Sequence, residues 1–96
     1  MLRLTLAAVL ALGLSACSRP LDAQECNDLL DHYTDLLAKN RDPEVSGEDL
    51  LRLKKEARAR AAQSREFSRC SSKVSRAEWE CAMKAPSVDE AERCLL

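Results

Sequence analysis

DAQECNDLLDHYTDLL (residues 22–37) carries the strongest structural signal in this 96-residue chain. Its first four residues form a capping box, in which Asp22 precedes a helix and Glu25 stands at the third helical position. Behind the box, apolar side chains recur at helical spacing, at Cys26, Leu29, Leu30, Tyr33, Leu36 and Leu37. The stretch therefore predicts an amphipathic helix that ends near residues 39–40, before Pro43.

Three further helix starts follow the same rule, because Ser46, Ser75 and Ser87 each stand three residues before an acid. The second helix has an apolar stripe that thins from leucines to alanines, and a bend or end is expected near Ser64. Pro86 closes the third helix. Four starts, no alternating strand pattern and only two glycines predict an all-α fold, a small antiparallel bundle of about four helices over residues 22–96.

The N-terminal segment is typical of an export signal. A short positive start at Met1–Arg3 precedes an apolar run over Leu4–Leu14, which is too short to span a bilayer core that needs about 20 residues. Leu14, Ser15, Ala16 and Cys17 then resemble the lipobox of bacterial prolipoproteins at all four positions. The resemblance implies a diacylglyceryl group on the Cys17 sulfur, cleavage before Cys17 and acylation of its new amino group.

This resemblance divides the chain into a signal peptide (residues 1–16), a lipidated tether (17–21) and a helical domain (22–96). It implies a bacterial envelope protein that faces the periplasm and is held to the membrane by lipid, including palmitate, on Cys17. Ser18, which is not Asp, favours the outer over the inner membrane in such lipoproteins. The competing interpretation is an ordinary secretory signal, in which Cys17 is incidental.

Lipidation of Cys17 leaves four cysteines, and an even set in a small exported chain predicts two disulfides. We expect Cys26–Cys70 and Cys81–Cys94. Antiparallel helices on either side of the Pro86 turn would bring the second pair level, and the first pair would join the ends of the first hairpin. The rival pairing is Cys26–Cys81 with Cys70–Cys94.

Catalytic and metal-binding residues are not expected. The chain has no C-x-x-C pair and no His-x-x-x-His, so thiolate binding of a metal is disfavoured, and no cofactor motif is present. His32 is the only histidine, and without a nucleophile beside it we expect an ordinary exposed helical residue. Trp79 is expected in the core, because the chain offers so few aromatic side chains.

Charge is segregated along the chain. Residues 22–49 hold nine acids and two bases, residues 52–76 hold nine bases and two acids, and residues 77–96 hold five acids and two bases. We expect the first two helices to attract each other as neighbours. Alternatively, the second helix presents a basic surface to anionic lipid or cell-wall polymer, with candidate contacts at Arg52, Lys55, Arg58, Arg65 and Arg69. The overall charge of the chain, with 15 basic and 16 acidic residues, does not favour binding of nucleic acid.

The segment from Cys26 onward, with Cys81-Ala82-Met83 and a final Cys94-Leu95, resembles small four-cysteine helical lipoproteins of unknown function. No activity follows from that resemblance. We expect a non-catalytic, lipid-anchored structural or interaction module that binds another envelope protein. The alternatives are an inhibitor or immunity-type lipoprotein, and a binder of anionic lipid or wall polymer.

Overall fold

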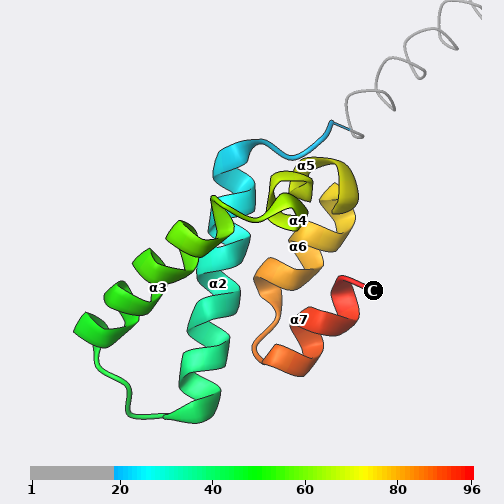
Figure 1. Cartoon of the computed structure of the whole chain (residues 1–96). Coiled ribbons are helices and arrows are strands. Elements are labelled where there is room, and N and C mark those ends of the chain that lie inside the picture. Colours follow the sequence, from blue (N-terminus) through cyan, green and yellow to red (C-terminus); the bar gives the residue numbers. More distant parts are fainter. Residues whose placement is uncertain (1–18) are drawn as a thin grey trace, which may run out of the picture.

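The computed structural model describes residues 19–96, and this part of the chain consists of helices joined by loops, with no strand (Figure 1). The expected signal peptide and the lipobox, including Cys17, lie outside the described residues. No helix within residues 19–96 is long and apolar enough to cross a membrane. The helices are α2 (Ala23–Arg41), α3 (Gly47–Ala61), α4 (Arg65–Ser68), α5 (Cys70–Lys73), α6 (Arg76–Lys84) and α7 (Val88–Cys94).

The predicted caps determine where the longer helices begin. Asp22 accepts a hydrogen bond from the backbone N–H of Glu25, whose carboxylate accepts one from the N–H of Asp22, so the expected capping box is present. Ser75 and Glu78 form a second reciprocal box at the start of α6. At α3 and α7 only the serine half is present, through Ser46 and Ser87.

The expected bundle of about four helices is confirmed only as an all-helical fold, because the second half of the first hairpin is broken into shorter pieces. α3 ends at Ala61, and Ser64 adopts an extended backbone and caps the one-turn helix α4. A second one-turn helix, α5, follows at once. Ser64 competes for the backbone N–H of Phe67, which interrupts the helix at the bend that the sequence predicted. The break turns Cys70 back toward the start of α2, where the sulfur of Cys26 lies.

Opposite charges hold α2 and α3 side by side. The guanidinium of Arg58 binds both carboxylate oxygens of Asp31, with 2.9 Å between Nε and Oδ1. Lys54 Nζ lies 3.1 Å from Asp35 Oδ2. The predicted attraction between the acidic first helix and the basic second helix is therefore present as two ion pairs.

The core is small and lies where the tether, α2 and α5 meet. Leu21, Cys26 and Cys70 are buried together, and Phe67, Val74 and Trp79 pack against them. Trp79 was expected in the core. It packs against the buried cluster and is itself half-buried. Ala82 in α6 is fully buried. Its small side chain allows α6 to approach the neighbouring helices α2 and α7 closely.

Candidate docking groove and the contacts that hold it

An open groove follows one face of α2. Its volume is about 860 Å³, within the range of about 300–1,000 Å³ that ligand sites commonly have. The α2 side chains that line it, from Cys26 to Leu37, recur three and four residues apart. They are Cys26, Leu29, Leu30, Tyr33, Thr34 and Leu37. The stripe that the sequence predicted for the core is therefore covered only in part by this chain.

The other walls come from segments far apart in the sequence. α3 contributes its last turn at Ala57 and Ala61, while the α4–α5 segment contributes Phe67 and Val74. The end of the chain closes the third side with Leu95 and Leu96. The side chain of Leu37 is 41% exposed and that of Leu96 is 98% exposed, so the apolar floor remains accessible to solvent.

A hydrogen bond across the groove connects α2 with α7. The hydroxyl of Tyr33 donates to Glu92 Oε1 at 2.6 Å. This bond to the carboxylate, together with partial burial, raises the pKa of Tyr33 above its usual value of 10.0. The contact fixes the position of α7 beside the apolar stripe of α2.

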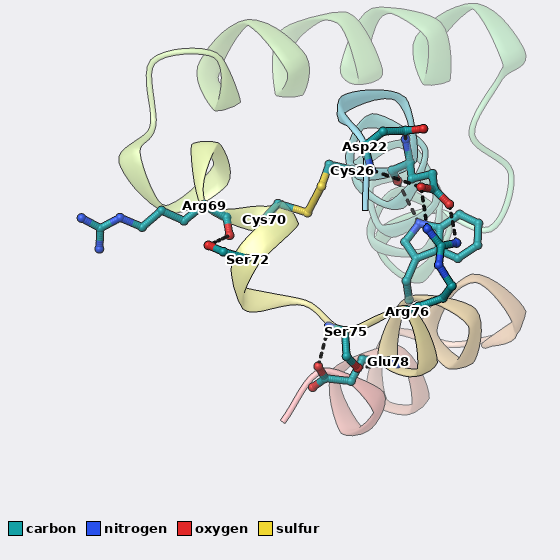
Figure 2. Close-up of a disulfide and its surroundings, with 10 residues drawn as sticks. Asp22, Cys26, Arg69, Cys70, Ser72, Ser75, Arg76 and Glu78 are labelled. Atoms are coloured by element: carbon teal, nitrogen blue, oxygen red, sulfur yellow. Dashed lines mark hydrogen bonds and ion pairs between the residues drawn. A yellow bond between two sulfur atoms is a disulfide. The ribbon is translucent and has the colours of Figure 1, made fainter. Parts of the chain in front are cut away.

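Two disulfides secure the walls. Cys26 is bonded to Cys70, and Cys81 is bonded to Cys94, which is the pairing that the sequence analysis preferred. Figure 2 shows the first bridge, which joins α5 to the start of α2. Cys26 and Cys70 are 4% and 7% exposed. The Cys81–Cys94 bridge joins α6 to α7, and its Cys81 half is exposed.

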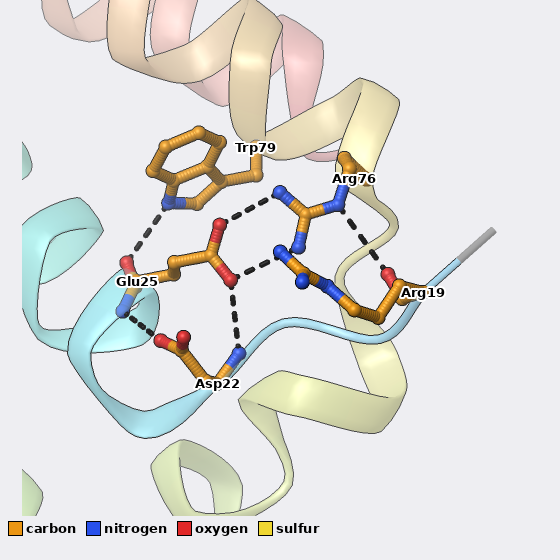
Figure 3. A network of polar contacts seen from close by, with 5 residues as sticks. All are labelled: Arg19, Asp22, Glu25, Arg76 and Trp79. Atoms are coloured by element: carbon orange, nitrogen blue, oxygen red, sulfur yellow. Dashed lines mark hydrogen bonds and ion pairs between the residues drawn. The ribbon is translucent and has the colours of Figure 1, made fainter. Parts of the chain in front are cut away.

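A polar network at the start of α2 fixes α6 in place (Figure 3). Arg76 donates to both carboxylate oxygens of Glu25, at 2.7 and 2.9 Å, and also to the backbone carbonyl of Arg19. The indole N–H of Trp79 donates to the carbonyl of Glu25 at 2.8 Å. The side chains of Arg76 and Glu25 are only 22% and 16% exposed, so this pair is more sheltered than those of α3.

The Arg76 guanidinium, followed by the backbone N–H of Asp22, lowers the pKa of Glu25 from 4.5 to about 2. A carboxyl whose pKa is lower in the folded state stabilises the fold above its unfolded pKa, and this contribution disappears as pH falls through the folded pKa. We therefore expect the urea midpoint of the protein to fall as pH drops from about 4.5 to about 2, with part of that slope due to Glu25.

The substitution E25Q should flatten this acid slope most, because it removes the titrating group, and R76Q should flatten it in part, because the N–H of Asp22 still lowers the pKa of Glu25. E48Q, at an exposed acid in the first turn of α3, is the matched control. Urea titrations followed by circular dichroism would measure the midpoints. Equal acid slopes in E25Q and the wild type would contradict this assignment.

His32 was expected to be exposed, and the structure shows that it is not. It is half-buried, and its Nε2 lies 3.0 Å from the carbonyl oxygen of Ala85, at the end of α6. An Nε2–H donor therefore links the middle of α2 to the α6–α7 turn. This contact could not be predicted from the sequence, because the partner is a backbone carbonyl 53 residues away.

The five basic residues that were predicted to contact an anionic surface lie in different elements and have different partners. Arg52 pairs with Asp49 and Glu56 of its own helix, and Arg58 pairs with Asp31 of α2. Lys55 is exposed on α3. Arg65 and Arg69 do not belong to α3, since they lie in and directly after α4. The five candidate contacts are therefore divided between α3 and the α4 segment, on the two sides of the break at Ser64.

Within residues 19–96, no group of three His, Cys, Asp or Glu side chains is placed to hold a metal ion. No family model matches this chain, and no similarity to a curated protein or to a solved structure is found.

Proposed function

We propose that this protein is a lipid-anchored, non-catalytic module of a bacterial envelope that binds another envelope protein through the groove along α2. The observation that carries the proposal is the open groove along the apolar stripe of α2, in which Leu37 is exposed and Leu30 and Tyr33 are half-buried. An apolar groove that is open to solvent often marks an interaction site. The lipobox at Leu14–Cys17 supports attachment to the membrane through lipid on Cys17.

The shape of the groove favours a helix of the partner. The stripe runs from Cys26 to Leu37, and at 1.5 Å per residue this distance is about 16 Å, or three helical turns. Spacing by three and four residues on α2 suits the side chains of a second amphipathic helix laid along it. Tyr33, with its fixed hydroxyl, supplies an aromatic anchor of the kind that often dominates binding energy.

Leu37 and Leu51 allow a matched test, because both are exposed leucines and only Leu37 lines the groove. A photo-crosslinking amino acid would be placed at position 37 or at position 51 in the full chain, expressed in its own envelope. We expect one specific adduct from position 37 and none from position 51. Adding the substitution L30D should abolish the adduct.

Equal adducts at both positions, or none at either, would contradict binding through the groove. The identity of the partner then decides between the expected roles. A structural envelope protein supports the scaffold function, whereas a toxin or a hydrolase supports the inhibitor or immunity function.

A further inference from the structure

Basic side chains gather at one end of the domain. The α4–α5 segment carries Arg65, Arg69 and Lys73, all of them exposed, and Arg19 lies exposed at the start of the described chain. We call these four residues the basic pole. Glu66 is the single acid within α4 and α5. Among residues 19–96, no acid forms an ion pair with Arg65, Arg69 or Lys73. The side chain of Arg19 points toward the carboxylate of Glu25 (Figure 3).

The pole lies where the tether enters the domain. In Figure 1 the chain that leads into α2 passes beside α5, and the α2–α3 connection is at the opposite end of α2. Leu21 is buried against Cys26 and Cys70, and Cys70 directly follows Arg69. The disulfide therefore holds the pole against the base of the tether.

The connection at the opposite end of α2 is acidic. This connection and the first turn of α3 carry four acids and one base over residues 41–49. Near the pole, Asp22 and Glu78 cap helices and Glu25 pairs with Arg76, and these carboxylates keep their negative charge. The contrast in charge is therefore between the basic α4–α5 segment beside the tether and the acidic α2–α3 connection.

The distance to the proposed anchor is short. Cys17 precedes Arg19 by two residues, so even an extended chain keeps it within about 7 Å of Arg19. That distance is comparable with the Debye length of about 8 Å at physiological ionic strength. Arg19 would therefore lie within reach of a membrane surface that holds the lipid on Cys17, and the packing of Leu21 against Cys70 places the α4–α5 segment beside the same tether.

From this juxtaposition we propose that the basic pole is the membrane-facing surface of the domain and binds the anionic headgroups of the lipid bilayer. The inference rests on the proposed lipid anchor and adds an orientation to it. α2 stands away from the bilayer, the acidic α2–α3 connection is farthest from the surface, and the groove opens to the side. Each basic side chain near an anionic membrane surface strengthens binding to that surface about fivefold. Three or four such side chains are therefore enough to orient the domain on the membrane, which the lipid anchor alone does not do.

Three exposed lysines report this orientation in the unmodified protein. Lys73 belongs to the pole, whereas Lys39 and Lys84 lie at the far ends of α2 and α6. The full lipidated protein, purified from membranes, would be inserted into preformed vesicles and treated with a membrane-impermeant amine reagent. Peptide mapping would then give the modification rate of each lysine. In vesicles containing phosphatidylglycerol we expect Lys73 to react several-fold more slowly than in detergent, and Lys39 and Lys84 to be unchanged.

The protection of Lys73 should disappear at high salt and in vesicles of phosphatidylcholine alone. It should weaken in R65Q/R69Q and persist in the matched variant R52Q/K55Q, whose changes lie on α3. Equal modification of Lys73 and Lys39 in anionic vesicles would overturn the proposal. Protection that is the same in neutral vesicles would also overturn it, since it would come from the anchor and not from headgroup binding.

The mass of the N-terminal peptide in the same sample separates the two proposals. A peptide without lipid refutes the anchor. If Lys73 is nevertheless protected by anionic vesicles in that sample, the contact of the pole with headgroups stands by itself. Protection centred on Lys55 instead of Lys73 would assign the membrane contact to α3 and contradict the pole.

Discussion

Replacing Cys26 and Cys70 together by alanine is expected to lower the free energy of unfolding by about 4 kcal/mol, because the bridge closes a long loop, with a sequence separation of 44 residues. A core of this size alone supplies only about 3–5 kcal/mol. The variant should therefore be largely unfolded near physiological temperature. For this variant we expect loss of the helical circular dichroism signal, or a midpoint of urea unfolding close to zero.

The second bridge provides the matched comparison. Cys81–Cys94 closes a loop with a sequence separation of 13 residues, so C81A/C94A should cost about 3 kcal/mol. The first pair is also buried against Leu21, so its removal disturbs the core directly. A larger loss in C81A/C94A than in C26A/C70A would contradict this ranking, as would free thiols at all four cysteines in protein isolated from the envelope.

The second large effect concerns the anchor. C17A should abolish incorporation of labelled palmitate and leave an unprocessed precursor that retains residues 1–16. Each buried methylene contributes about 0.8 kcal/mol, so the two chains of a diacylglyceryl group hold a small domain firmly where one chain holds it marginally. S18D is the control, since it should keep the label and shift the protein from the outer to the inner membrane. Labelling that survives C17A would contradict lipidation at Cys17.

Features that depend on neighbouring residues could be predicted from the sequence. The capping box at Asp22 and Glu25 involves residues three apart, so its backbone hydrogen bonds follow from the pattern alone. The break near Ser64 was likewise indicated by a polar residue that ends an apolar stripe. The disulfide pairs followed from helix directions and a turn at Pro86.

Apart from the disulfides, contacts between residues far apart in the sequence could not be predicted. The pairing of Glu25 with Arg76 joins residues 51 apart, and nothing in the local pattern selects that arginine among nine bases between residues 52 and 76. The groove was missed for a related reason. The stripe of α2 reads as core in the sequence, and only the packing of α3 and α7 reveals that part of it stays accessible.

The central claim is that the domain is held to the membrane by lipid on Cys17, and the mass of the N-terminal peptide of protein isolated from native membranes tests it most directly. The claim predicts a peptide that begins at Cys17 and carries a thioether-linked diacylglyceryl group and an acylated amino terminus. A peptide with an unmodified Cys17 thiol, or an N-terminus at any other residue, would contradict it.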